Sequence, residues 1–325
     1  MTPSRRSLLA LAGTSLLARP ALAQGSFPER PVRIVIPFPP GGPTDLMGRY
    51  VGQRLQAQWG QTVIADNRAG ASGTLGSQLV ARAAPDGYTL VFSNNATHGA
   101  IEQLSPQTTP YRTLTDFTPV ALVGIAPLVM VVRASLPVND ARSFVELARR
   151  QPGRVTYASA AFGSAPHLAS ELLKLATSTD MVHVPFNGTA PATQALISDN
   201  VDMYMGGVSS VRPLVESGRA RAIAVVYRER LHSWPGLATL AEQGISGVEY
   251  ESWYGLLGPA GLPAPLLAQL NAAVRQVLGG DEVRAQLESY GLERVLGPPE
   301  DLTRIIRGEM ERTAQVIRAG NLRVE

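Results

Sequence analysis

Short β-branched runs that alternate with helical segments are the feature that most restricts how this chain can fold. The first unit joins a strand at residues 31–38, through a glycine-rich turn, to a helix at residues 46–59. Two further strands, at residues 61–65 and 88–93, enclose a helix at residues 76–84. This order predicts an α/β fold with a mostly parallel sheet, whose ligand sites lie beyond the carboxyl ends of the strands.

A second set of strands and helices begins near residue 126. We expect strands at residues 126–132, 155–159, 181–185, 201–205, 221–226 and 253–257, and helices at residues 143–150, 163–176, 190–197, 265–278, 281–290 and 299–319. A chain of 325 residues is long enough for two lobes. The order of elements alone does not show whether the C-terminal helices return to the first lobe.

Composition removes several classes of protein. The chain is 45% hydrophobic and 17% charged, which is typical of a globular protein and excludes disorder and a coiled coil. Cysteine is absent, so the sequence cannot supply a disulfide framework, a thiol nucleophile, a cysteine-based zinc site or an iron–sulfur cluster.

The first 23 residues have the layout of an export signal. Arg5 and Arg6 precede an apolar run at residues 8–17, and Ala21 and Ala23 supply the small-x-small pattern that signal peptidase needs. We expect cleavage after Ala23; both general secretion and twin-arginine export fit this sequence. Removing the segment lowers the basic residues from 29 to 26, against 26 acidic ones. The near-zero net charge gives no electrostatic case for a nucleic-acid partner or an anionic membrane.

The glycine-rich turn has the ingredients of an anion site. Gly41 and Gly42 permit close approach to the backbone, and the N–H groups and dipole of the following helix attract negative charge. Thr44 and Asp45 open that helix, and Asp45 is better suited to capping it than to facing an anion. The same residues are equally typical of a tight turn before a capped helix that binds no ligand.

A second helix start follows the strand at residues 155–159. Ser164 is placed as an N-cap, Pro166 lies in the first turn, and Gly163 leaves the approach open. Ser164 and His167 could form a nucleophile and base, but Pro166 and His167 replace the residues that a nucleophile elbow requires after its serine. Helix capping is therefore favoured over catalysis. The two starts together indicate a cleft that holds an anion, with a carboxylate favoured over phosphate because no arginines cluster there.

Other cofactor sites lack support in the sequence. The histidines His98, His167, His183 and His232 show no metal-ligand spacing, and no glycine-rich dinucleotide fingerprint is present. The aromatic residues that could line a cleft, although core packing is the simpler role for each, are Phe38, Phe186, Tyr204, Trp253 and Tyr254.

Several blocks of sequence, in this order, resemble one receptor family. They are residues 27–33, 37–45, 66–70, 81–90, 116–120, 157–159 with Gly163, Ser164 and His167, and 253–256. The chain resembles the periplasmic substrate-binding receptors of tripartite tricarboxylate transporters, the Bug receptor group. The resemblance spans nearly the whole mature chain.

This resemblance implies a Venus-flytrap fold, each lobe a mostly parallel sheet flanked by helices. Residues 24–125 and 228–325 would form lobe 1, and residues 126–227 lobe 2. It also implies a small organic acid held between the lobes without cofactor, metal or catalysis, and delivered by a monomeric periplasmic protein to membrane permease subunits. The residues expected at the ligand are Phe38, Gly41, Gly42, Thr44, Asp45, Ser93, Ser159, Gly163, Ser164, His167, Phe186, Asn187, Gly188 and Tyr204.

Two positions depart from the family pattern. Residues 185–188 read Pro-Phe-Asn-Gly where members commonly have Pro-Tyr-Lys-Gly, so a hydroxyl and a cation are missing near the expected cleft. Arg112 replaces a usual acidic residue. Two other functions remain open. An extracytoplasmic sensing component shares every sequence feature of a transport receptor, and a secreted serine hydrolase would use Ser164 and His167.

Overall fold

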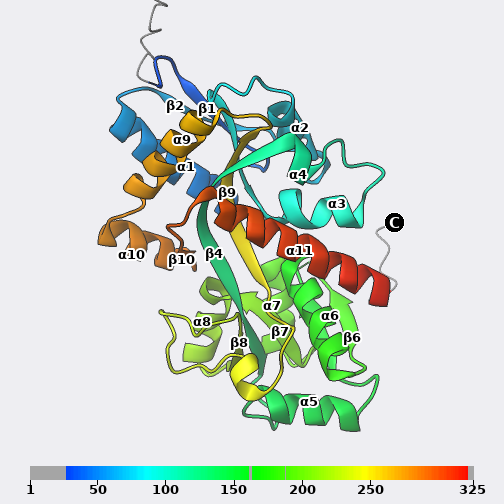
Figure 1. Cartoon of the computed structure of the whole chain (residues 1–325). Helices are drawn as coiled ribbons and strands as arrows, with labels where there is room; N and C mark the ends of the chain where they lie inside the picture. The colour runs from blue at the N-terminus through cyan, green and yellow to red at the C-terminus, as the bar shows by residue number, and fades with distance from the viewer. Residues whose placement is uncertain (1–26, 161–162, 187, 321–325) are drawn as a thin grey trace, which may run out of the picture.

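The computed structural model describes residues 27–160, 163–186 and 188–320. The expected signal segment, its cleavage site and Asn187 lie outside the described residues. Two lobes of sheet and helix stand one above the other, joined by one long strand that runs through both (Figure 1). Within the described ranges, no helix has both the length and the apolar character needed to cross a membrane.

The first lobe contains three parallel strands and the helices that pack on them. The strand order β2-β1-β3-β9 ends on β9, which is antiparallel to β3. Its elements are β1 (Val32–Ile36), α1 (Pro43–Trp59), β2 (Val63–Asn67), η1 (Ala71–Gly73), α2 (Thr74–Ala81), β3 (Thr89–Asn94), β9 (Glu251–Pro259), α9 (Ala264–Val277), α10 (Asp281–Ser289) and β10 (Glu293–Arg294). The β1 residues are β-branched and almost all buried, as a parallel strand covered on both faces requires.

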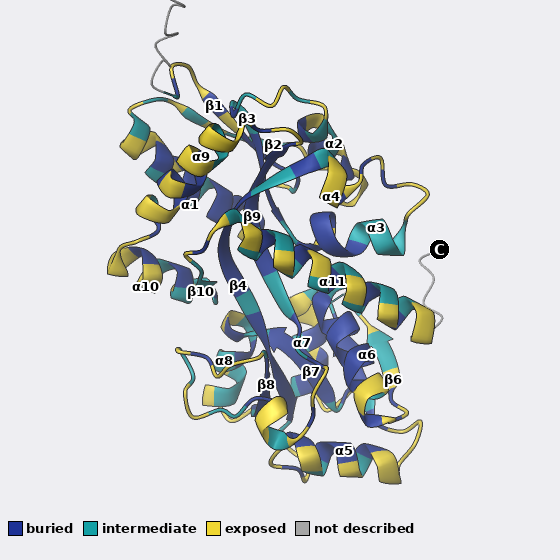
Figure 2. Ribbon diagram, in the orientation of Figure 1, coloured by how far each residue is buried: buried dark blue, intermediate teal, exposed yellow. Residues whose placement is uncertain are grey.

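The second lobe repeats the strand–helix alternation. Strands β5 and β6 are parallel, as are β5 and β7. Its elements are α5 (Ala141–Arg150), β5 (Thr156–Ser159), α6 (Ala165–Thr177), β6 (Val182–Pro185), α7 (Thr189–Ile197), β7 (Met203–Gly207), α8 (Val208–Glu216), β8 (Ala220–Val226) and η3 (Ala241–Gln243). The outward face of α5 is exposed, whereas α6 is buried along most of its length (Figure 2).

Strand β4 (Phe117–Arg133) links the two lobes. It pairs with β9 as far as Pro127 and with β7 and β8 from Leu128 onward, always antiparallel. Helix α11 (Pro299–Gly320) crosses the junction beside β4 and reaches α6 (Figure 1). Between β3 and β4 lie η2 (Ala96–Ala100), α3 (Ile101–Leu104) and α4 (Thr113–Asp116).

The expected strand at residues 126–132 is only the second half of β4. Its first half contains Pro119 and Gly124, which disrupt a regular strand pattern, and register shifts occur on both sides of Leu122. Helix α8 was not expected, because Pro213 lies inside it and Gly206 and Gly207 precede it. The pairs around β4 and β9 are antiparallel, and the parallel pairs lie to one side of them in each lobe, at β2-β1-β3 and at β6-β5-β7.

Side chains between β8 and β9 pack in the second lobe, which affects where that lobe ends. After β8, buried Leu231 packs in the second lobe, and Leu240, Ile245 and Val248 join the core that includes Phe144. We propose that the second lobe extends to the start of β9 rather than ending at residue 227, because these side chains bury their apolar surface there.

Candidate functional site

A cavity of about 520 Å³ lies between the two lobes. The first lobe contributes the start of α1, strand β9 and the turn after α10, and the second contributes the starts of α6, α7 and α8. The lining residues are Pro43, Leu46, Met47, Ala126, Leu128, Ala160, Pro166, Thr189, Tyr204, Gly207, Ser209, Ser210, Ser252, Tyr254, Ser289, Tyr290, Gly291 and Leu292. This size is within the range of small-molecule sites.

The α1 start is held by the Asp45 carboxylate. Gly41, at φ +90°, donates its N–H to Asp45 Oδ2 over 2.9 Å. Asp45 Oδ1 accepts from Arg49 Nε at 2.8 Å and from Asn67 Nδ2 at 2.8 Å. Gly42, rather than Asp45, is the N-cap residue. Asp45 therefore fixes the turn before the helix, and the expectation that it caps the helix is wrong.

Burial alone would raise the pKa of Asp45. Hydrogen bonds from Gly41 and Asn67, together with the Arg49 guanidinium, more than offset burial and hold the pKa of this carboxyl below its ordinary value. The side chain therefore stays ionised, although only 3% of the residue is exposed. Because Asp45 already accepts the Gly41 N–H, that N–H is not a free donor for a ligand.

The α6 start is held by a histidine in the same geometry. Gly163, at φ +73°, donates its N–H to His167 Nδ1 over 3.0 Å. Ser164 is the N-cap residue in extended backbone, and Pro166 lies in the first turn, as the sequence predicts. His167 Nδ1 acts as an acceptor, so the imidazole is neutral at this atom.

His167 belongs to a stack of rings beneath this turn. Its ring lies 4.0 Å from that of His183 and nearly parallel to it, and His183 stacks in turn on Tyr157. His183 Nε2 contacts Ser159 Oγ at 2.7 Å. Burial, with His183 close by, lowers the pKa of His167 to about 4, and burial also lowers the pKa of His183. Both rings are thus neutral at neutral pH.

The hydrolase hypothesis predicts an acidic residue that orients His167. The carboxylate of Glu171, four residues along α6, accepts from the Tyr157 hydroxyl and lies 2.9 Å from Lys174 Nζ. This pairing directs Glu171 toward Lys174 and Tyr157. If His167 Nε2 acted as the base for a serine, His167 Nδ1 would have to donate a proton to the orienting acid. Nδ1 instead accepts the Gly163 N–H and so has no proton to donate, which argues against the hydrolase hypothesis.

The α7 start completes the group of helix termini. Gly188, at φ +113°, is its N-cap residue and donates its N–H to Ala160 O over 2.7 Å. Thr189 and Ala160 line the cavity, next to Tyr204. The starts of α1, α6 and α7 thus meet at the cavity that the start of α8 also lines, and the dipoles and first-turn N–H groups of these helices favour an anion there.

The sequence-predicted residues differ in how close they come to the cavity. Tyr204 lines it, while Gly42, Thr44, Ser159, Gly163, Ser164 and Gly188 flank its lining in the turns. Gly41, Asp45 and His167 hold those turns through the hydrogen bonds described above. Phe186 packs in the core near Ala158, Phe38 borders the turn that Asn67 holds, and Asn187 lies outside the described residues.

Ser93 is directed into the protein. It is fully buried, and its hydroxyl contacts Thr97 and, at 2.6 Å, His98 Nδ1. The expectation that Ser93 contacts the ligand directly is therefore not met in this conformation. The sequence reasoning also missed Leu46, Met47, Ser252, Tyr290 and Leu292, which reach the cavity only through the packing of α1, β9 and the turn after α10.

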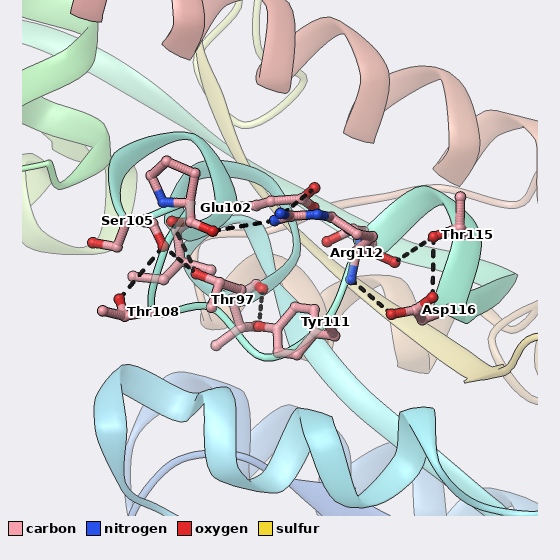
Figure 3. A network of polar contacts seen from close by, with 12 residues as sticks. Thr97, Glu102, Ser105, Thr108, Tyr111, Arg112, Thr115 and Asp116 are labelled. Carbon is pink, nitrogen blue, oxygen red and sulfur yellow. Dashed lines mark hydrogen bonds and ion pairs between the residues drawn. The ribbon is translucent and has the colours of Figure 1, made fainter.

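The unusual Arg112 lies in a loop network away from this lining (Figure 3). Its guanidinium is 3.8 Å from Glu102, and its N–H donates to Asp116 Oδ2 over 2.8 Å. Tyr111 Oη donates to Thr97 O over 2.5 Å in the same network. Arg112 therefore stabilises the connection between α3 and α4 rather than the ligand.

Comparison with known proteins identifies similar chains over nearly the full length. The family model of the tripartite tricarboxylate transporter family receptor matches residues 47–322. Protein BugT of Bordetella pertussis is 32% identical, with 96% of each chain covered.

Two solved structures carry ligands. Rpa4515 of R. palustris with adipate is 34% identical, with a TM-score of 0.73, and the match covers 90% of this chain and 97% of that one. MatC of Rhodopseudomonas palustris with bound malate is 35% identical, with a TM-score of 0.69, covering 90% and 100%. The two-lobed α/β binding-protein fold is confirmed by these similarities. The family is one of receptors rather than enzymes, and the periplasmic binding protein BugD is a further structural neighbour, 29% identical with a TM-score of 0.71 over 92% of this chain and 100% of that one.

Proposed function

The chain belongs to the tripartite tricarboxylate transporter receptor family, and on this premise we propose that it captures a small organic carboxylate between its lobes. The observation that carries this proposal is the convergence of the α1, α6 and α7 starts on one cavity. Adipate and malate in the two neighbours support the ligand class. Delivery to the permease subunits of a tripartite transporter is the corresponding role in the cell.

The proposed anion site uses backbone groups. The first-turn N–H groups of a helix have no acceptor within the helix, and Thr44 and Thr189 stand in such positions. Gly42 and Ser164 form the N-cap positions on the two facing sides. Gly41 and Gly163 shape the turns, since each gives its N–H to a side chain four residues later.

The remaining features follow from export. We propose that the signal segment directs the chain to the periplasm with cleavage after Ala23, and that the mature protein acts as a monomer. Mass analysis of the exported protein checks the first point, and a mature chain that begins anywhere but Gln24 contradicts it.

Calorimetric titration with mono- and dicarboxylic acids, preceded by a thermal-shift screen, tests the ligand class. An acid at 100 times its Kd adds about 2.7 kcal/mol to the free energy of unfolding. Substituting Gly42→Asp places a negative charge at the α1 start, where an added Cβ meets no atom within 4 Å. We expect a folded variant that no longer binds the acid.

Gly280→Asp is the matched control. Gly280 is the N-cap residue of α10 at φ −74°, close to the φ of −80° at Gly42, and it does not line the cavity. This variant should bind as the wild type does. Unimpaired binding by folded Gly42→Asp, or equal loss in both variants, would contradict the proposed site.

A further inference from the structure

The walls of the cavity beyond the three helix starts are uncharged. Every described lining residue is apolar, aromatic, glycine or a hydroxyl residue. Among the described lining residues, the charge complement for a ligand therefore comes from the helix starts alone.

The apolar part of the wall faces the cavity from both lobes. Leu46, on the first turn of α1, is 43% exposed and lines the cavity together with Met47. Leu128, Leu292 and Tyr254 line it from β4, the turn after α10 and β9. An apolar ligand that covers this exposed leucine removes its surface from water, and this burial favours binding.

The start of α8 is the remaining place where a second carboxylate could bind, and the first lobe covers it. A Cβ added to Gly291 would lie 2.9 Å from Ser209 Oγ and 3.1 Å from Ser209 N. The Ser210 hydroxyl donates to Gly207 O over 2.7 Å. The turn at Gly291 therefore lies directly against Ser209 in the first turn of α8 and leaves the Ser209 N–H little room for an anion.

From this distribution we infer that the ligand carries one carboxylate on an uncharged, mainly apolar body. The inference rests on the proposed function, since it assigns the single charge to the α1, α6 and α7 starts. A second carboxylate would be buried against leucine, methionine and hydroxyl groups, which replace its hydration poorly. The dicarboxylates bound by the two neighbours are accordingly not the preferred ligands of this chain.

Hexanoate and adipate form a matched pair for the test, because both have six carbons and they differ in one carboxylate. Calorimetry on the mature protein should give hexanoate or benzoate a Kd at least tenfold below those of adipate and malate. Tighter binding of adipate than of both monocarboxylates overturns the inference and leaves the proposed function intact. Binding by no carboxylate in a wider screen overturns both.

Leu46→Arg tests the apolar wall directly. Adding a cation there should lower the Kd for adipate relative to hexanoate at least tenfold. The control is Leu75→Arg, at a leucine on α2 that is 56% exposed and away from the cavity, and it should leave both Kd values unchanged. If folded Leu46→Arg retains the wild-type Kd ratio, the assignment of this wall to the ligand body is refuted.

Discussion

The starts of α1 and α6 face the same cavity with one geometry and two chemistries. At each start, a glycine with positive φ donates its N–H to a side chain four residues later, over 2.9 Å at Gly41 and 3.0 Å at Gly163. The acceptor is the Asp45 carboxylate in the first lobe and the neutral His167 imidazole in the second. The difference teaches that the turn geometry, not the charge of the acceptor, is what the two lobes share.

The surroundings explain why each acceptor keeps its charge state. Asp45 accepts from Asn67 and from the charged Arg49 as well as from the turn, so the carboxylate is compensated. His167 packs face to face against His183, where protonation of one ring would bring a charge against the other. The first lobe therefore fixes its turn through a charged network, and the second through a stack that excludes charge.

Removing the charged acceptor should have the largest effect. Asp45→Ala removes the acceptor of Arg49 Nε and of the Gly41 N–H, and one of the two acceptors of the Asn67 amide, and we expect a loss of about 3 kcal/mol in the free energy of unfolding. Ligand binding should be lost with the shape of the turn. Denaturant unfolding and calorimetry measure the two effects.

Asp140→Ala supplies the control, since Asp140 caps α5 by accepting the Ser143 N–H over 2.7 Å at an exposed site. Its loss should lower the free energy of unfolding by about 1 kcal/mol and leave the Kd unchanged. Equal destabilisation by the two alanine variants would contradict the view that Asp45 organises a network.

Much of this comparison could be predicted from the sequence, because local signals define both helix starts. Glycine, a cap position and proline in the first turn occur in both segments, and a short strand precedes each of them. The role of Asp45 was misjudged: its place in the first turn suggests a cap, but the turn brings Gly41 back to it. Sequence spacing does not give that backbone direction.

The remainder of the site depends on contacts between distant segments. Gly291 meets Ser209 only because the turn after α10 approaches the start of α8 across the lobes, and Ser252 reaches the cavity only through the register of β9 with β4. The first half of β4 was missed for a different reason, since Pro119 and Gly124 interrupt its pattern. Tertiary packing, rather than local preference, determines these positions.

Lowering the pH should affect the two helix starts at different pH values. The pKa of His167 falls to about 4 on folding from its ordinary value of 6.5, because of burial and the neighbouring His183. The unfolded chain therefore takes up a proton first as the pH drops below 6.5, and stability is lost through this window down to about pH 4. The pKa of Asp45 lies below its ordinary value, so its contribution is lost only at lower pH.

The matched variant isolates this contribution. At pH 4.5 the His167 share should be about 2 kcal/mol. His167→Gln should show a correspondingly shallower fall in stability between pH 7 and 4.5, while the buried His98 and the half-buried His183 continue to contribute to it. Substituting the exposed His232 by Gln is the control. Identical pH profiles for wild type and His167→Gln would contradict this role.

Replacing each of the two turn glycines by alanine should have different costs, because the added Cβ has different neighbours. Alanine is strained at either positive φ, by about 1 kcal/mol. A Cβ at Gly41 meets nothing within 4 Å, whereas a Cβ at Gly163 would lie 2.8 Å from Leu104 Cδ1. We therefore expect Gly163→Ala to lower the free energy of unfolding by about 1 kcal/mol more than Gly41→Ala does. This additional loss should disappear when Leu104 is also replaced by alanine. A double-mutant cycle measures this coupling, and a coupling near zero counts against the contact.

The smallest expected effect comes from replacing the cap residue of α1, glycine at position 42, by serine. Gly42→Ser places a hydroxyl at an extended N-cap position with open space around it, so stability should rise by a few tenths of a kcal/mol. A capping serine accepts a first-turn N–H, the group that we assign to the carboxylate. Gly42→Ser should thus be more stable yet bind the acid more weakly. If calorimetry gives an unchanged Kd while unfolding shows the added stability, the α1 N–H groups do not hold the ligand.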